Sequence, residues 1–139
     1  MNGSSGDDVA NRQAMDRLRA AAESGDITAL DGAIKDVAAD DIVVEWPQSG
    51  ERIRGIANFR AIGENYTAQT GLNPRMTLRR VSGTGRTYIA EGTIDYGDGT
   101  PVSWVGISEF ADGRLVRQTE YWGNPFEPPA WRKPWVERM

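Results

Sequence analysis

The sequence predicts a single α+β domain, in which a strongly curved, mixed or antiparallel β-sheet packs against three helices from the N-terminal half. Two observations support this fold class. Apolar residues recur at helical spacing in three segments of the first half, and four β-rich runs in the second half are separated by glycine-containing turns. The 139 residues are enough for one domain with its own hydrophobic core.

The first two helices are predicted from their caps and their apolar spacing. A helix from Asp7 to Glu23 is expected to have the acidic residues of its first turn as caps, with one apolar face formed by Met15, Leu18 and Ala22. Asp26 is the expected N-cap of a second helix, whose apolar residues recur at intervals of three and four as far as Val37. The two helices are therefore expected to follow each other across a short turn.

A β-hairpin and a third helix are predicted next. The run 42–46 is β-branched and aromatic, the residues 47–50 have turn composition, and the run 51–54 returns. After Gly55 the apolar spacing becomes helical again. The face of this third helix is expected to carry Ile56, Phe59, Ile62 and Tyr66.

Four strands follow, joined by three short turns that each contain glycine. This spacing is typical of an antiparallel meander, in which each strand pairs with the next one along the chain. The predicted strands are 76–81, 87–96, 102–110 and 115–122.

Composition excludes several classes of function. The chain has no cysteine and no histidine, so thiolate chemistry and the usual base near neutral pH are both absent. A formal charge of −4 without a basic run argues against nucleic-acid binding. No apolar run is long enough for a membrane span or a signal peptide, so a cytoplasmic protein is expected. We expect no cofactor and no metal, although carboxylates alone can hold hard cations.

Glu120 is the candidate catalytic residue. It lies near the end of the last predicted strand, just before a proline-rich segment, and shares one face with Gln118 and Trp122 because side chains alternate along a strand. A carboxylate among tryptophans in a pocket would have its pKa raised by desolvation, as an acid or base in catalysis requires. The alternative is a structural glutamate that pairs with Arg117 or Arg54.

Two segments carry a resemblance to a known family. Residues 39–47 read Ala-Asp-Asp-Ile-Val-Val-Glu-Trp-Pro, and residues 110–115 read Phe-Ala-Asp-Gly-Arg-Leu, with Glu-Tyr-Trp at 120–122. They resemble the first strand and the last hairpin of the nuclear transport factor 2-like superfamily, most closely its SnoaL-like group of polyketide cyclase-like and ketosteroid isomerase-like proteins. The resemblance implies a cone of bent sheet and three helices around a deep apolar pocket, and a homodimer formed through the convex sheet face.

The residue that acts as the base in ketosteroid isomerases is not present at the matching position of this chain. That base is an Asp in a Glu-Asp-Pro sequence at the end of the first strand, where this chain has Trp46. A tryptophan cannot take a proton from a carbon acid, so isomerisation by that route is not expected. The predicted strand 102–110 also offers no Asp for that family's oxyanion hole, since its one acid is Glu109.

Epoxide hydrolases of the limonene type provide a second comparison. By the same alignment, Val44 and Trp46 stand where those enzymes bind water with Tyr and Asn. Their Arg and Asp positions fall on Glu91 and Thr93, or one residue later, so only the last acid of the set is kept, as Glu120. SnoaL-like cyclases place their acid–base carboxylate, an Asp, on the same final strand. The resemblance therefore implies an acid–base role for Glu120.

The predicted strands also offer candidate walls for a small apolar ligand. Tryptophans on three neighbouring strands would supply a flat aromatic surface, and Gly106 would leave space where a side chain would fill the cavity. The alternative is ordinary core packing of the same residues. The candidate substrate-binding residues on these strands are Val44, Trp46, Trp104, Gly106, Ser108 and Trp122.

Two further candidates depend on which face of an element is buried. Glu91 and Thr93 alternate with Ala90 and Gly92, and period alone does not decide which pair faces inward, so Glu91 is kept as a substrate-binding candidate with a structural or interface role as its alternative. Tyr66 is expected in the core, with its hydroxyl reaching the pocket.

The two ends of the chain are expected to differ from the domain between them. Residues 1–6 contain Gly-Ser-Ser-Gly and are expected to be a flexible leader, followed by a single domain over 7–139. The tail 123–139 contains four prolines, which rule out a strand, and three large aromatic residues, which favour docking as a lid on the pocket or on a second subunit. A short helix is predicted over 130–138.

Three functions remain open from sequence. The first is a cofactor-free acid–base enzyme, an isomerase, cyclase or hydrolase or lyase, that acts on a small apolar molecule through Glu120. The second is a binding module without turnover, and the third is an interaction domain whose cone is filled by its own tryptophans. The first predicts that Glu120 lies in an open cavity without an arginine partner, the second that Glu120 is ion-paired, and the third that there is no cavity.

Overall fold

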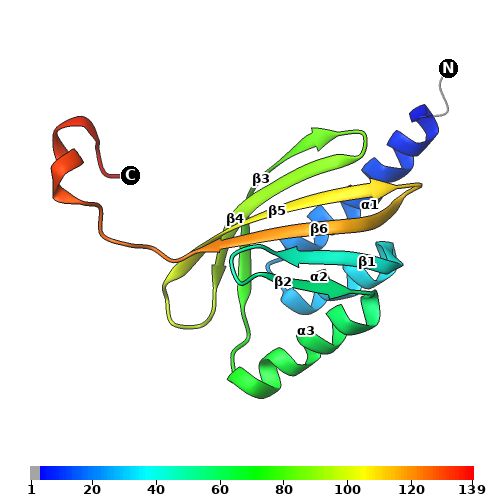
Figure 1. The fold of residues 1–139 in the computed structure, drawn as a ribbon, viewed down its shortest axis with the longest axis horizontal. Coiled ribbons are helices and arrows are strands. Elements are labelled where there is room, and N and C mark those ends of the chain that lie inside the picture. The colour runs from blue at the N-terminus through cyan, green and yellow to red at the C-terminus, as the bar shows by residue number, and fades with distance from the viewer. Residues whose placement is uncertain (1–3) are drawn as a thin grey trace.

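A computed structural model describes residues 4–139, and it contains three α-helices, one six-stranded sheet and a short 3₁₀ helix (Figure 1). The helices are α1 (Ser4–Glu23), α2 (Ile27–Val37) and α3 (Ile56–Thr70), and the 3₁₀ helix η1 is Ala130–Trp135. Among these residues, no helix combines the length and the apolar character needed to cross a membrane.

The strands follow the predicted pattern of one hairpin and one meander. They are β1 (Ala38–Trp46), β2 (Glu51–Arg54), β3 (Arg75–Thr84), β4 (Thr87–Asp95), β5 (Pro101–Ala111) and β6 (Arg114–Gly123). Their order in the sheet is β2-β1-β6-β5-β4-β3. Neighbours pair antiparallel except β1 and β6, which run parallel and join the hairpin to the meander. The predicted α+β fold with a mixed sheet is confirmed.

Local signals place most helix ends correctly. The carboxylate of Asp26 accepts a hydrogen bond from the backbone N–H of Thr28 at 2.9 Å, so the predicted N-cap of α2 is confirmed. The start of α1 is a correction, because the helix begins at Ser4 and takes in residues 4–6 of the predicted leader; the preceding residues lie outside the described part. Asp7 falls inside the first turn, where its charge complements the helix dipole.

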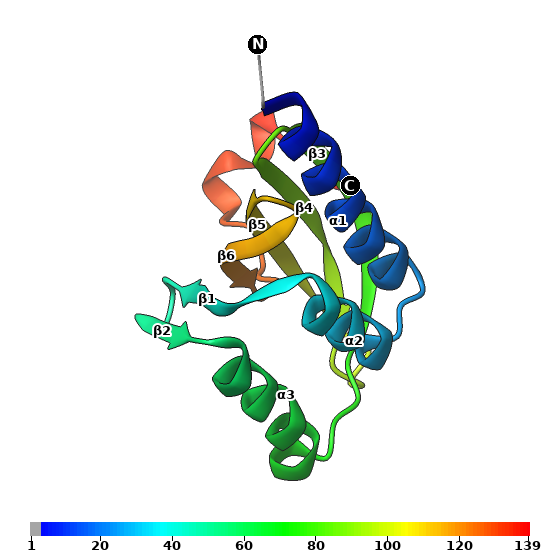
Figure 2. The same cartoon turned by 90° about the vertical axis from the view of Figure 1, so that its right-hand side faces the viewer.

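The helices cover one face of the sheet, and the core lies between them (Figure 2). One cluster packs the apolar face of α1, including Met15 and Leu18, against Ile42 and Phe110. A second cluster lies further along the same face and contains Met76, Ala90, Ile94 and Trp104, together with Ala22 of α1. Helix α3 contributes no fully buried residue, and Ile62 of its predicted apolar face is 41% exposed.

Glycine permits the close approach of β3 and β4. A Cβ atom at Gly92 would collide with the backbone carbonyl of Thr77, and the register between these strands shifts between Leu78 and Arg80. Bulges of this kind bend a strand and increase its twist. The sheet can therefore curve around the second core cluster, as the cone shape requires.

Asn11 ties α1 to two hairpin turns. Its side chain is fully buried, donates to the carbonyl of Gly85 at 3.2 Å and accepts from the N–H of Gly113 at 2.8 Å. These turns join β3 to β4 and β5 to β6. A buried amide that satisfies one backbone acceptor and one backbone donor fixes the helix across the end of the sheet. The spacing of apolar residues along α1 did not predict this role of Asn11.

The C-terminal tail leaves the sheet at the end of β6 and extends away from the domain (Figure 1). Its aromatic side chains are largely exposed: Phe126 by 78%, Trp131 by 72% and Trp135 by 78%. Helix η1 occupies part of the predicted 130–138 helix but ends at Trp135. Within the chain itself, this segment does not form a lid.

Candidate functional site

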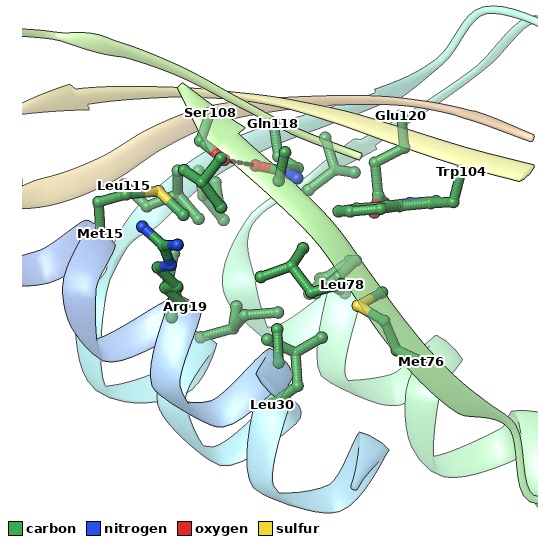
Figure 3. Close-up of a pocket in the computed structure, with 18 residues that line it drawn as sticks. Met15, Arg19, Leu30, Met76, Leu78, Trp104, Ser108, Leu115, Gln118 and Glu120 are labelled. Carbon is green, nitrogen blue, oxygen red and sulfur yellow. Dashed lines mark hydrogen bonds between the residues drawn. The ribbon is translucent and has the colours of Figure 1, made fainter. Parts of the chain in front are cut away.

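A cavity lies between the concave face of the sheet and the helices (Figure 3). It contains about 590 Å³ of empty space, including the part that opens to solvent. Most of the side chains around it are apolar and come from all three helices and from β1, β3, β4, β5 and β6. They are Met15, Leu18, Ala22, Leu30, Ile34, Ile42, Val44, Phe59, Met76, Leu78, Val81, Ala90, Trp104 and Leu115, with Arg19, Ser108, Gln118 and Glu120 as the polar members.

Glu120 lies on the cavity side of β6, directly across from Gly106 of β5. Gln118 shares this face and also lines the cavity, as the period of a strand predicts. Tyr121 lies on the opposite, outer face and is 41% exposed. The position of Glu120 therefore follows from ordinary alternation along β6.

Two tryptophans hold the Glu120 carboxylate through their indole nitrogens. Trp46 of β1 donates from Nε1 to Oε1 at 3.0 Å, and Trp104 of β5 donates from Nε1 to Oε2 at 3.1 Å. None of the ion pairs among the described side chains involves Glu120. The carboxylate is thus held by neutral donors from the strands on either side of β6.

The pKa of Glu120 is raised, and burial is the main cause. Hydrogen bonds from Trp46, Trp104 and Gln118 stabilise the ionised form and lower the pKa in part, and the negative charge of Asp31 on α2 raises it further. An ionised carboxylate has about four lone-pair sites, so these three donors leave about one position at which Glu120 can accept a proton. Glu120 therefore keeps an open acceptor position, and burial disfavours its charged form.

Gly106 allows the Trp104 ring to lie where it does. A Cβ atom at Gly106 would come within 2.5 Å of Cζ2 of Trp104 and 2.8 Å of Nε2 of Gln118. This corrects the expectation that Gly106 leaves open space in the cavity, because the indole and the amide occupy that space. The absence of a side chain permits the hydrogen bond from Trp104 to Glu120.

A second polar pair lies beside Glu120. Ser108 donates from its hydroxyl to the Gln118 side-chain oxygen at 2.5 Å, and both residues line the cavity (Figure 3). This bond orients the Gln118 amide so that its NH₂ group is left to face Gly106 and Glu120. The polar wall thus consists of a fixed amide and a carboxylate on one strand.

The other predicted aromatic residues do not line the cavity, which corrects the selection of Trp122 and Tyr66 as substrate-binding candidates. Trp46 and Trp122 meet edge to face with ring centroids 5.5 Å apart, and the buried indole nitrogen of Trp122 has no partner among the described residues. Tyr66 of α3 lies 6.1 Å from Tyr96 between ring centroids. Burial raises the pKa of Tyr96, with smaller contributions from Tyr66 and Glu120. Of these aromatic residues, Trp46 contacts Glu120 directly, and Tyr96 lies near enough for the charge of Glu120 to affect its pKa.

Glu91 does not belong to the cavity, which corrects its selection as a substrate-binding candidate. Ala90 lines the cavity, so Glu91 lies on the other face of β4, where it pairs with Arg80. The alternation of side chains along β4 does not tell which face points inward. The packing of β3 and the helices against the Ala90 face decides it. Val44, Trp104 and Ser108 lie on the wall as predicted, whereas Trp46 reaches the site through its hydrogen bond.

Arg19 contributes a charged side chain to the wall and is not among the residues predicted from sequence. Arg19 follows Met15 by four residues on α1 and therefore lies on the same helical face. The spacing of four residues from Met15 was the sequence feature that could have predicted this position for Arg19. Charged residues beside an apolar stripe are usually solvated, so the pattern gave no reason to select it.

Comparisons with known proteins agree on one family. A family model described as a SnoaL-like domain matches residues 15–118. A nuclear transport factor 2-like protein of unknown function from Burkholderia xenovorans LB400 is 36% identical, with a TM-score of 0.71 over 94% of this chain and 95% of that one. No curated protein matches the sequence closely enough to count as a relative.

Two further solved structures carry functional descriptions. A proposed ketosteroid isomerase from Kribbella flavida DSM 17836 is 25% identical, with a TM-score of 0.69 over 95% of this chain and 88% of that one. A proposed polyketide cyclase from Sinorhizobium meliloti is 19% identical, with a TM-score of 0.56 over 78% of this chain and 93% of that one. The second likeness concerns the fold alone.

Proposed function

This chain belongs to the SnoaL-like domain family, and we propose that it is a cofactor-free acid–base enzyme that acts on a small, largely apolar molecule, with Glu120 as the group that accepts and returns a proton. The reaction type would be that of an isomerase, a cyclase, or a hydrolase or lyase. The proposal rests on the cavity, on the position of Glu120 and on the family's range of reactions.

The main support for the proposal is the way in which the Glu120 carboxylate is held. The Glu120 carboxylate lines an apolar cavity and is held by Trp46 and Trp104 rather than by a cation. A structural glutamate in the core is normally neutralised by a basic partner, because an unpaired buried charge is costly. Here the indole donors orient the carboxylate without removing its capacity to bind a proton. This is the arrangement that an acid–base role predicts.

The surroundings of Glu120 suit the transfer of a proton to and from a weak acid. The cavity wall is largely apolar, so a bound molecule that displaces water from it would interact more strongly with charged groups there. In the ionised state Glu120 would remove a proton from a C–H or O–H group, and in the protonated state it would return that proton to another atom. The fixed amide of Gln118 would donate a hydrogen bond to an oxygen of the same molecule.

A second candidate function is ligand binding without turnover, although the ion pair of Glu120 that was expected for it is not found among the described residues. Each Glu120 oxygen already accepts one indole hydrogen bond, and such bonds would be equally useful in anchoring β1, β5 and β6 to each other. In that case the cavity would hold a small apolar molecule, and Glu120 would serve only to fix Trp46 and Trp104. The two functions share a ligand site and differ in whether Glu120 changes its protonation state during turnover.

A combined binding and turnover screen tests the proposal. The protein would be co-crystallised with a panel of small apolar carbonyl, epoxide and phenolic compounds, and the same compounds would be monitored for consumption. A compound that occupies the cavity beside Glu120 and is consumed supports the enzyme. Occupancy without consumption across the panel supports the binding module, and a cavity that admits no compound contradicts both functions.

We also propose that a second copy of the chain covers the outer face of the sheet. That face exposes Tyr121 by 41% and Ile89 by 45%, and the tail, with its exposed aromatic residues, extends beyond its own domain (Figure 1). Exposed apolar groups of this extent are typical of protein contacts. The tail of each subunit would then pack against the other subunit.

Changing Tyr121 to lysine is expected to convert the protein to monomers, because a charge would be buried in the middle of the contact. Sedimentation velocity should give about twice the 15.3 kDa chain mass for the wild-type protein and the chain mass for this variant. Gln69→Lys on the exposed side of α3 adds the same charge elsewhere and should leave the dimer intact. A wild-type protein that sediments as a monomer contradicts this proposal.

A further inference from the structure

The wall of the cavity carries two charged side chains of opposite sign. Among the residues that line it, Arg19 and Glu120 are charged, Ser108 and Gln118 are polar and neutral, and the rest are apolar. In Figure 3 Arg19 projects from α1 on one side of the cavity, and Glu120 lies beside Trp104 on the other side. A molecule that fills the cavity would therefore meet a cation at one end and the proposed acid–base group at the other.

Arg19 occupies the solvent-facing margin of the cavity. Its side chain is 46% exposed, and its Nε pairs with Oε1 of Glu23 one helical turn away at 2.9 Å. Glu23 is itself 56% exposed, and among the described side chains it is the one ion-pair partner of Arg19. A guanidinium has five N–H donors, so this contact leaves most of them available to another acceptor.

The other charged groups near Arg19 on α1 are already paired. Arg12 and Asp16 form a separate pair at 3.2 Å and line a small neighbouring hollow, which Arg19 also lines, whereas neither of the two lines the cavity. Among the described side chains, the ion pair of Asp16 is with Arg12 and that of Arg19 is with Glu23. The exposed pair between Arg19 and Glu23 is weak, as solvent-exposed pairs in helices generally are. A buried or half-buried anion in the cavity would compete with Glu23 for the guanidinium.

We infer that the ligand is an amphipathic acid: its carboxylate, or a similar planar anion, binds Arg19 at the cavity margin, and its apolar body extends along the wall towards Glu120. The inference rests on the proposed function, because it names the substrate class of the same cavity. The guanidinium fork matches a carboxylate in geometry and can bind it through two hydrogen bonds. The negative charge of ionised Glu120 repels an anion at the other end, so the molecule would bind in one orientation.

A matched pair of probes tests this inference. Naphthalene-2-carboxylate and naphthalene-2-carboxamide share an apolar body and differ in charge, and isothermal titration calorimetry would give the affinity of each. The wild-type protein is expected to bind the carboxylate about five- to tenfold more tightly than the amide, the range of one charge-assisted contact at a partly exposed site. Arg19→Met keeps the apolar stem, and it should abolish this preference while leaving the amide affinity within about twofold.

Arg12→Met is the matched control, because it removes one positive charge from the same helix but outside the cavity. It should retain the preference for the carboxylate. The inference is overturned if Arg19→Met keeps the preference, or if Arg19→Met and Arg12→Met reduce it equally. Binding of both probes without a preference leaves the proposed function standing and rejects the role of Arg19, whereas failure of both probes to bind every variant contradicts the apolar ligand site as well.

Discussion

Glu120→Gln is expected to lower kcat/KM about 10²- to 10⁴-fold for any compound that the wild-type protein turns over, the usual contribution of a general acid or base. Glutamine has nearly the same shape and can still accept one indole hydrogen bond, so the cavity should keep its ligand. It cannot take up a proton. The measurement is kcat/KM for the wild-type and variant proteins with the same compound, together with the dissociation constant from calorimetry.

The same role of Glu120 predicts the direction in which kcat/KM changes with pH. If the ionised form of Glu120 is the base, kcat/KM should rise with pH as the carboxyl loses its proton, and the midpoint should lie above the ordinary glutamate value of 4.5, because burial raises the pKa. Glu109→Gln on β5, where the carboxylate is 43% exposed and lies near Arg117, is the control and should keep wild-type activity. Unchanged turnover in Glu120→Gln rejects Glu120 as the acid–base group.

Trp104→Ala is expected to lower the free energy of unfolding by about 3–5 kcal/mol, the range for removing a buried large aromatic side chain. Trp104 is 7% exposed, belongs to the second core cluster, and lies over Gly106, which cannot fill the space left behind. The variant also removes one of the two indole donors to Glu120. Denaturant unfolding followed by circular dichroism would measure the loss.

Trp104→Phe separates packing from hydrogen bonding. It keeps most of the aromatic volume but has no N–H, so a loss of about 1–3 kcal/mol is expected from the unsatisfied Glu120 oxygen. The loss should therefore be smaller than in Trp104→Ala. If both variants are as stable as the wild-type protein, Trp104 does not contribute to the core as its burial indicates.

The elements of this fold were predictable where local signals decide them. The Asp26 cap, the hairpin of β1 and β2 and the glycine turns of the meander depend on a few consecutive residues, and the structure confirms them. The parallel pairing of β1 with β6 joins segments about 70 residues apart, and no local pattern encodes it. The start of β1 at Ala38 is another consequence of that pairing, because Ala38 pairs with Leu115.

The site was predictable to a smaller extent than the fold. Alternation along β6 placed Glu120 with Gln118 on one face, but the bond from Trp46 spans 74 positions in the sequence and requires the full strand order. At Gly106 the missing side chain predicts open space, but the Trp104 ring occupies it, and the orientation of that ring depends on packing rather than on period. For Glu91, period left two faces open, and tertiary contacts selected the outer one.

The central claim is that Glu120 is a partly buried carboxyl in the cavity wall whose ionised form is stabilised by two indole N–H groups. Carbon-13 NMR of the side-chain carboxyl during a pH titration measures its pKa directly, in the wild-type protein and in Trp104→Phe. We predict a wild-type pKa above 4.5, because burial disfavours the charge, and a higher pKa in Trp104→Phe, because that variant lacks a donor that lowers it. A wild-type pKa at or below 4.5, or one that does not change when the indole N–H is removed, would contradict the account.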